Sequence, residues 1–534
     1  MSSSALAILH AFHRQLQESV LSGIKHFHGK ANPVIASYAA RFQRSLPKDF
    51  RHVTQRRLID QAQSADVVLF GDFHTLAESQ SAFFDVLRMT YEQNPSRPIT
   101  VALEIFAAAD QTNIDEYLSG RLPEEYFLKR IDYHNKWGFP WENYRPIVEF
   151  CARYKLPIVG INHQTDQKDR LAKRDVFAAQ IIDSIHVANS QALIFCLIGE
   201  YHLADEHLPS RLKDKRVLRV VNNVDEYSLP FMDEPIASFE AVEIQPNFFC
   251  VLNTSPWLKW HSLALWEELH GLSEDSFYGG ESDGFASEDF DVEYQLLFIL
   301  KTLNEFMGLG ISASQLSFDI YLKPDRATFS YLRGKFSLSR QSLESAERKL
   351  NQDGYCYLPK SKAILLLDFS MNHLLEVAGF ILMECISEGL KKSFAFSDRV
   401  RYQMAGTVCG LLLNPRRFVY TWERVEIEWK ATQRKRLLGE ARKHREAYKL
   451  VRSFYEDDFS CLDKASKALE EKDKDCNYLV SRIFGETLGA QLFAVFLRSD
   501  ALEFKKGLKA LFENDLKWNL ELLEIEPESL RVAS

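Results

Sequence analysis

Two histidines in this chain follow apolar runs in the same local pattern of glycine, acid, aromatic residue and histidine. Val67–Phe70 leads into Gly71–His74, and Ala192–Ile198 leads into Gly199–His202. Imidazole and carboxylate groups can move protons to and from water, and they also bind borderline divalent ions. Because parallel strands deliver their carboxyl ends to one edge of a sheet, we expect both segments to contribute to one site.

The residue types suggest a division of roles within this site. We expect His74 and His202 to be metal ligands or general bases, Glu104 to be a ligand or base, and Asp72 and Glu200 to be orienting or ligating carboxylates. The metal would be zinc, manganese, iron or cobalt, held by His74, Glu104, His202 and Asp72, and it would lower the pKa of a bound water. The same groups could perform acid–base chemistry without a metal.

Arg174 is a further catalytic candidate, on a helix predicted to follow the third strand. Its guanidinium could bind an anionic substrate group in bidentate fashion, or it could form an ion pair with Glu104, Asp72 or Asp175. The aromatic segment Trp137–Tyr144 could form a pocket wall or fill the core.

The elements that must position these residues alternate between short apolar runs and amphipathic stretches. The strands are expected at Val67–Phe70, Ile99–Phe106, Leu156–Ile161, Leu193–Ile198 and Val217–Val221. Helices are expected at Leu76–Tyr91, Gln111–Leu118, Tyr144–Tyr154 and Gln167–Ile185. This alternation predicts an α/β fold, a mostly parallel sheet with helices on both faces, followed by a mainly α-helical C-terminal domain.

At 534 residues the chain is long enough for two or three domains. We expect a helical N-terminal extension over 1–57, an α/β domain over 58–245, an aromatic and then acidic linker over 246–293, and a helical domain over 294–534. Within the last, Ala363–Leu367 and Leu374–Cys385 are interpreted as a buried helical hairpin, because polar residues interrupt them.

The overall composition indicates the cellular compartment of the protein and the classes of partner it is expected to bind. A net charge of −9 gives no general affinity for nucleic acid, and no apolar run is long enough for a membrane span. Eight cysteines without a CxxC pair, and no signal-peptide pattern at the N-terminus, predict a cytoplasmic protein with reduced thiols. The expected partners are a small-molecule or peptide substrate and, through the C-terminal helices, another protein or a second copy.

Residues from about 60 to 225 resemble the ChaN domain of the haem-binding-uptake/Tiki superfamily, whose wider relatives include erythromycin esterases and TraB and Tiki proteins. The stretches that carry this resemblance are Gly71–His74 with Gln80, Ala102–Phe106 with Gln111, Ile114–Gly120, Trp137, Tyr144-Arg145-Pro146, Ile161-Asn162, Arg174-Asp175 with Ala178, and Gly199–His202 with Leu208-Pro209.

The resemblance implies an α/β core in which both GxxH segments and the glutamate of the second strand share a site. In Tiki-type relatives these elements belong to a metal-dependent peptidase, in erythromycin esterases histidine activates water, and ChaN proteins are linked to haem or iron uptake. We therefore expect a divalent-metal-dependent hydrolase of an ester, lactone or peptide. The alternatives are a non-catalytic haem- or iron-binding protein, with no haem ligand assigned, or a degenerate scaffold.

Overall fold

The computed structural model describes residues 4–27, 33–163, 170–228, 239–270, 292–386, 396–433, 439–456, 474–514, 519 and 523. These residues form two compact units. The first, here called the α/β unit, comprises the described parts of His13–Phe231 and Ser238–Phe290. The second, the helical unit, comprises the remaining described residues, most of them after 291.

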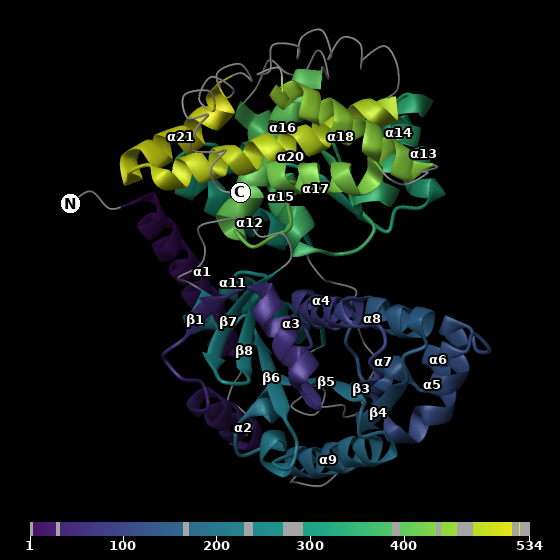
Figure 1. Ribbon diagram of the computed structural model, residues 1–534. Coiled ribbons are helices and arrows are strands. Elements are labelled where there is room, and N and C mark those ends of the chain that lie inside the picture. Colours follow the sequence, from purple (N-terminus) through teal and green to yellow (C-terminus); the bar gives the residue numbers. More distant parts are fainter. Residues whose placement is uncertain are drawn as a thin grey trace. The chain divides into compact units, whose positions relative to one another are not determined.

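An eight-stranded sheet forms the centre of the α/β unit (Figure 1). In spatial order its strands are β1 (Arg51–Val53), β7 (Glu240–Gln245), β8 (Phe248–Leu252), β6 (Val217–Asn222), β2 (Val67–Asp72), β5 (Leu193–Gly199), β3 (Ile99–Ala107) and β4 (Ile158–Asn162). The strands from β8 to β4 are paired in parallel, and β7 and β1 pair antiparallel. Every residue of β2 is buried, which explains its continuous apolar run.

Helices cover both faces of this sheet, so the predicted fold class is confirmed. The helices of the unit are α1 (Ala5–Phe27, from His13 onward), α2 (Pro33–Arg44), α3 (Gln55–Ser64), α4 (Ala77–Gln93), α5 (Gln111–Leu118), α6 (Glu124–Arg130), α7 (Tyr133–Lys136), α8 (Trp141–Tyr154), α9 (Arg170–Ala188), α10 (Asp225–Ser228) and α11 (Pro256–His270). Phe83 of α4 and Ile147 of α8 pack in the core on one face. Phe42 of α2 and Ile182 of α9 pack in the core on the other.

Two segments differ from the sequence-based interpretation. Part of the expected linker forms strand β8 and helix α11, because β7 and β8 pair around a tight turn in which Asn247 adopts a φ of 62°. Asparagine tolerates this left-handed conformation better than most residues, so Pro246-Asn247 was a turn signal. In the N-terminal extension, β1 pairs with β7 beside the expected helices. The acidic part of the expected linker, up to residue 291, lies outside the described residues.

The helical unit is built mainly from long helices. They are α12 (Val292–Met307), α13 (Arg326–Phe336), α14 (Arg340–Asp353), α15 (Met371–Ile386), α16 (Phe396–Leu413), α17 (Trp422–Gln433), α18 (Glu440–Glu456), α20 (Lys474–Arg498) and α21 (Ala501–Glu513). A small sheet of β10 (Tyr355–Leu358), β11 (Ala363–Leu366) and β9 (Asp319–Leu322) accompanies them. The hairpin interpretation was therefore wrong at Ala363–Leu366, since four residues with partners on both sides make a strand.

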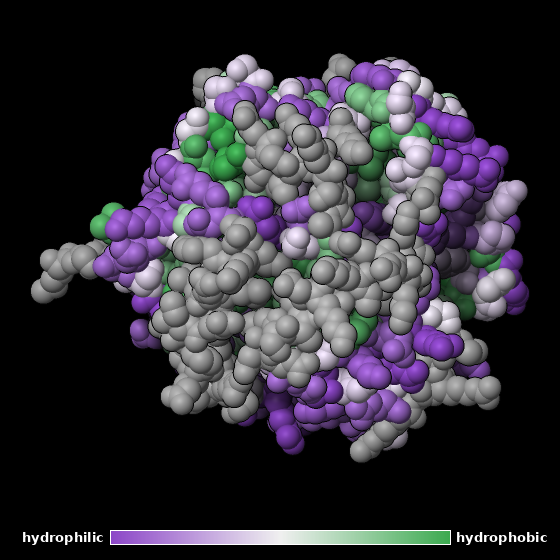
Figure 2. Space-filling model, turned by 90° about the horizontal axis from the view of Figure 1, so that it is seen from above, coloured by the Kyte–Doolittle hydropathy of each residue, from purple (hydrophilic) through white to green (hydrophobic). Residues whose placement is uncertain are grey.

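Among the described residues, Asn477–Arg498 is the one stretch long and apolar enough to cross a membrane. Of its most apolar window, 78% is buried inside the fold, as in the core helix of a globular protein. Among the residues that are coloured by hydropathy in Figure 2, hydrophilic ones predominate and the hydrophobic areas are smaller. Six cysteines of the described residues, Cys151, Cys196, Cys250, Cys356, Cys385 and Cys409, carry no disulfide in the structure.

Candidate functional site

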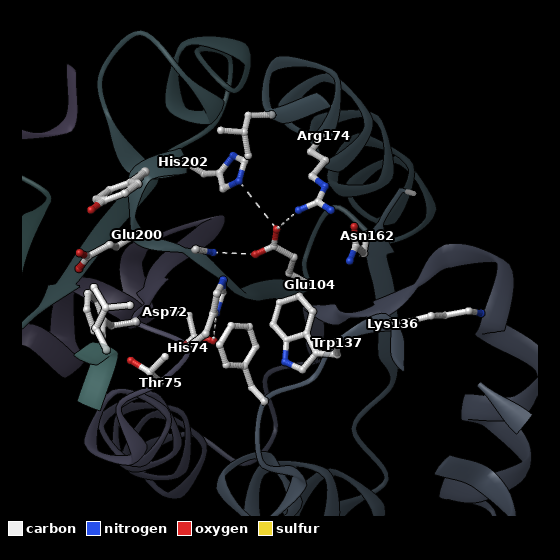
Figure 3. Close-up of a pocket in the computed structure, with 16 residues that line it drawn as sticks. Asp72, His74, Thr75, Glu104, Lys136, Trp137, Asn162, Arg174, Glu200 and His202 are labelled. Atoms are coloured by element: carbon white, nitrogen blue, oxygen red, sulfur yellow. Dashed lines mark hydrogen bonds and ion pairs between the residues drawn. The ribbon is translucent and has the colours of Figure 1, made fainter. Parts of the chain in front are cut away.

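A cavity of about 80 Å³ lies where strands β2, β5 and β3 end side by side in the α/β unit (Figure 3). Its lining residues come from the ends of these strands and from neighbouring loops and helices: Asp72, Phe73, His74, Thr75, Glu104, Lys136, Trp137, Phe139, Asn162, Leu171, Arg174, Gly199, Glu200, Tyr201, His202 and Leu263. The structure therefore gathers all six of the candidate site residues around one cavity. Since a cavity needs about 10–15 Å³ to hold one water, this cavity has room for several waters or a small ligand group.

The end of β2 supplies a histidine held by an acid. Asp72 is the last residue of the strand and is buried, and its Oδ2 lies 2.8 Å from Nδ1 of His74. Tyr144 donates its hydroxyl to the same carboxylate at 2.9 Å, and Gln80 donates its side-chain amide. These contacts fix the ring of His74 and leave its Nε2 directed to the cavity. Asp72 is therefore an orienting residue rather than a free metal ligand.

The end of β5 supplies a second histidine held by a different acid. His202 lies in the 3-10 turn η2 (Glu200–Leu203), and its Nδ1 is 2.6 Å from Oδ1 of Asp175 on α9. Tyr38 of α2 donates its hydroxyl to the other oxygen of Asp175 at 3.2 Å. His202 is thus anchored at Nδ1 like His74, and only its Nε2 remains for chemistry.

Glu104 lies between the two imidazoles (Figure 3). One of its oxygens accepts the backbone N–H of Gly199 at 2.7 Å. The other lies 3.8 Å from Nε2 of His202 and 3.6 Å from a guanidinium nitrogen of Arg174. Glu104 is 3% exposed, so its charge is balanced by these neighbours rather than by solvent.

Gly199 allows this close approach. A Cβ atom at this position would lie 3.3 Å from Nε2 of His74, 3.5 Å from Cδ2 of His202 and 3.6 Å from Oε2 of Glu104. Any side chain at Gly199 would therefore project into the space that the three groups share. The backbone φ of Gly199 is −46°, which any residue can adopt, so the glycine of the second motif serves the space around the imidazole of His74 rather than the turn.

Glu200 lies apart from this arrangement, although it lines the cavity. Its carboxylate pairs with Nζ of Lys259 on α11 at 2.9 Å, and both side chains are buried. Lys259 also donates to the backbone carbonyl of Asn222 at 3.2 Å. Glu200 therefore joins η2 to α11 and β6, and it contacts neither histidine within the described hydrogen bonds.

The structure also places Arg174 and the aromatic segment Trp137–Tyr144 relative to the cavity. Arg174 forms the expected ion pair with Glu104, which leaves substrate binding as a further prediction. In the aromatic segment, Trp137 and Phe139 line the cavity at 4.7 and 5.0 Å from the ring of His74, whereas Trp141 is buried in the core. His163, the residue after β4, stacks on Phe177 and does not line the cavity.

The electrostatics favour protonated imidazoles. Burial lowers the pKa of His74, but the charges of Asp72 and Glu104 raise it more, so the net pKa is above the ordinary value. His202 behaves in the same way, with Asp175 and Glu104 outweighing burial and the charge of Arg174. Both histidines therefore retain a proton to higher pH than a free imidazole.

A divalent ion fits these residues only in part. Two imidazole Nε2 atoms and a carboxylate are suitable donors, and an acid at each Nδ1 is a common feature around metal-bound histidines. However, Glu104 is already engaged by Gly199 and Arg174, and Asp72 lies behind His74. Across the residues that the structure describes, no three His, Cys, Asp or Glu side chains are grouped closely enough to hold a metal ion.

Three side chains that contact the site residues were not predicted as such from the sequence. They are Lys259 on α11, Tyr38 on α2, and Asp175 on α9, which is the partner of His202; all three lie outside the two motifs in sequence. The position of Asp175 directly after the candidate Arg174 was an indication that it belongs to the site. No sequence pattern indicated Lys259 or Tyr38, because only the folded chain brings them to the site.

Residues 58–180 match the protein family described as "Haem-binding uptake, Tiki superfamily, ChaN", which confirms the resemblance over that segment. Among solved structures, the chain is similar to ChaN of Campylobacter jejuni, reported with cofacial haem binding. The similarity has 16% identity and a TM-score of 0.26, and it covers 34% of this chain and 94% of that chain. No curated protein matches this chain.

Proposed function

We propose that the cavity is a hydrolytic site in which the paired imidazoles activate water against an ester, lactone or peptide carbonyl. The observation that carries the proposal is the convergence of two acid-anchored histidines on Glu104. An acid at Nδ1 fixes each ring and raises its pKa, so that Nε2 accepts a proton when the ring is neutral and donates one when the ring is protonated.

The surroundings of the two histidines differ, so we assign a different catalytic role to each. Nε2 of His202 lies 3.8 Å from Glu104 and its Nδ1 lies 2.6 Å from Asp175, so the protonated form is stabilised on both sides. His202 is therefore assigned as the acid that protonates the leaving group. His74, whose side chain is 19% exposed, is assigned as the base: in its neutral form, which is populated above its raised pKa, its Nε2 removes a proton from the attacking water.

Arg174 and Asn162 provide contacts for the substrate. The guanidinium of Arg174 is buried at the cavity wall, where a positive charge stabilises the oxyanion that forms when water adds to a carbonyl. Asn162 is also at the wall, and its Oδ1 accepts no hydrogen bond from the described residues. That oxygen is available to a donor group on the substrate.

The first test is a panel of p-nitrophenyl esters, lactones and chromogenic peptides with the purified full chain. We expect turnover of one class, and a loss of about 100-fold or more in kcat/KM for His74→Ala and His202→Ala, the usual contribution of a general acid or base. His163→Ala is the matched control, because its ring lies outside the cavity, and it should retain the activity of the wild type.

The role of a metal is tested on the same protein. Because Glu104 is engaged by protein groups, we expect dialysis against a chelator to leave the hydrolytic rate unchanged. Restoration of a lost rate by zinc, manganese, iron or cobalt would assign the water to a metal instead. The absence of turnover across the whole panel would reject the hydrolytic proposal.

Haem binding is a second candidate, favoured by the match of residues 58–180 to the haem-binding-uptake family. Of the two histidines, His74 is the one that could reach the iron of a large macrocycle, since the His202 side chain is only 5% exposed. Trp137 and Phe139 beside His74 provide an apolar setting for a porphyrin. Haem titration would then give a Soret shift that disappears in His74→Ala and persists in His163→Ala.

A further inference from the structure

The charged side chains around the cavity of the α/β unit already have partners. Among the described residues of its wall, the charged side chains other than the histidines are Asp72, Glu104, Lys136, Arg174 and Glu200. Glu104 and Arg174 pair with each other, and Glu200 pairs with the buried Lys259. Asp72 lies 2.8 Å from His74. A charged group of a substrate would therefore lose its hydration at this wall without gaining an unengaged counterion.

Lys136 has the longest of these ion-pair distances, since its Nζ lies 3.9 Å from a carboxylate oxygen of Asp110. Its side chain is 37% exposed and extends away from Glu104 (Figure 3). An anion bound by Lys136 would thus remain near solvent and away from the two imidazoles. Lys136 therefore does not make the inner part of the cavity a site for a charged group.

Aromatic rings form the part of the wall beside His74. The rings of Trp137 and Phe139 lie 4.7 and 5.0 Å from the ring of His74. Phe139 stacks in turn on Trp266, with 5.1 Å between the ring centroids. Because Phe139 is buried and packed from behind, an apolar group of a substrate would be covered here without rearrangement of the wall.

Aliphatic side chains complete this apolar wall. Leu171 lies on α9 three residues before Arg174, so the two side chains share one face of that helix, and Leu263 comes from α11. A carbonyl oxygen directed to Arg174 would therefore place the attached acyl chain beside Leu171. The cavity volume of about 80 Å³ is roughly half of the 150 Å³ that accommodates benzene, which leaves room for about three or four carbon atoms.

We propose that the substrate of this site is an uncharged ester or amide with a short, apolar acyl group of about three or four carbon atoms. The inference rests on the hydrolytic function proposed above and narrows its substrate class. Each methylene group that the apolar wall removes from water should strengthen binding about fourfold, until the chain is longer than the cavity.

The test compares kcat/KM of the full chain for four p-nitrophenyl esters: acetate, butyrate, octanoate and monosuccinate. Butyrate should exceed acetate by about tenfold or more, because it adds two methylene groups. Octanoate should gain nothing over butyrate, because the end of its chain lies beyond the cavity. In monosuccinate a carboxylate replaces the terminal methyl group of butyrate, and its hydrolysis should be slower than that of butyrate by about 100-fold or more.

Substitutions of Leu171 should shift the preferred chain length in opposite directions. Leu171→Ala enlarges the cavity and should raise the octanoate-to-butyrate ratio of kcat/KM by about tenfold. Leu171→Phe fills the cavity and should lower the butyrate-to-acetate ratio by a similar factor. Val176→Ala, at an exposed position of α9 outside the cavity wall, is the matched control and should leave both ratios unchanged. If Leu171→Ala does not fold, Leu263→Ala replaces it with the same expected shift.

The outcomes separate this inference from the hydrolytic function. Turnover with equal kcat/KM for all four esters, or for butyrate and monosuccinate, would overturn the inference and leave the hydrolytic function standing. If no ester is hydrolysed, the hydrolytic function fails, and ligand-detected NMR with butyramide and succinamate decides the ligand class. These amides differ only in a terminal methyl or carboxylate group. We expect binding of butyramide alone, whereas equal binding, binding of succinamate alone, or binding of neither would overturn the inference.

Discussion

Replacing Glu104 by glutamine tests whether this carboxylate holds the two imidazoles in their protonated state. The glutamine side chain keeps the shape and can still accept the N–H of Gly199, which lies 2.7 Å from Glu104 in the wild type. It removes the negative charge 3.8 Å from Nε2 of His202. The pKa of His202 and that of His74 should both fall, because the charge of Glu104 raises both.

The size of the effect follows from the distance. Two unit charges 3.8 Å apart attract each other by about 4 kcal/mol at an effective dielectric constant of about 20. This value is an upper bound on the pH-dependent stability that the Glu104–His202 pair contributes. A histidine whose folded pKa is raised contributes its full stability below the unfolded pKa of about 6.5. That contribution is lost as the pH rises through the folded pKa.

The assay is urea unfolding of wild type and Glu104→Gln between about pH 6 and about pH 9, the range set by the raised histidine pKa values. We expect the wild type to lose more stability than the variant as the pH rises, by up to about 4 kcal/mol. Glu92→Gln, at an exposed position on α4, is the control and should follow the wild type. A constant difference between wild type and Glu104→Gln across this range would refute the coupling of Glu104 to the histidines.

Three further substitutions test the neighbours of this carboxylate. Asp72→Asn should lower the pKa of His74, measured by NMR titration of its imidazole, because the charge of Asp72 raises that pKa; an unchanged titration would contradict the assigned contact. Gly199→Ala should cut hydrolysis by about 100-fold while the chain stays folded by circular dichroism, since its methyl group would lie 3.3 Å from Nε2 of His74. Lys259→Met should reduce the unfolding free energy by about 3–5 kcal/mol by leaving buried Glu200 unpaired, and Lys259→Met/Glu200→Gln should recover most of that loss in urea unfolding.

Much of the α/β unit was predictable because its strands are buried on both faces. Such strands read as continuous apolar runs, and each expected run lies inside an observed strand, from Val67–Asp72 to Val217–Asn222, except that β4 starts at Ile158 rather than Leu156. The edge of the sheet was not predictable in the same way. β1 has three residues and none of them is buried, so it has no apolar run to recognise. The pairing of β7 with β8 depends on the turn at Asn247, which is a weak local signal.

The candidate residues were found by type and position, whereas their partners required the fold. The adjacency of His74, Glu104 and His202 follows from the strand order β2-β5-β3, in which β5 inserts between two strands that precede it in the chain. No pattern within one strand encodes that order. Tyr38 reaches Asp175 from 137 residues away, and Lys259 reaches Glu200 from 59 residues away, so neither contact is visible in local sequence.

The two similar tetrapeptides differ in structure for a geometric reason. Asp72 ends β2, and His74 lies two residues later in the turn before α4, where its Nδ1 is 2.8 Å from the carboxylate of Asp72. The acid of the first motif can therefore bind its own histidine. Glu200 and His202 lie instead in a 3-10 turn, where side chains two positions apart diverge by about 240°.

The acid of the second motif consequently turns away to Lys259, and His202 takes its carboxylate from Asp175 on α9. The two motifs therefore resemble each other in their histidines, each anchored at Nδ1 by an acid, and not in the acid that does the anchoring. It follows that Glu200→Gln should leave the pKa of His202 far less changed than Asp175→Asn does, since Asp175 is the largest contributor that raises it. An NMR titration of His202 in both variants checks this order, and a larger shift in Glu200→Gln would show that the motif acids act alike after all.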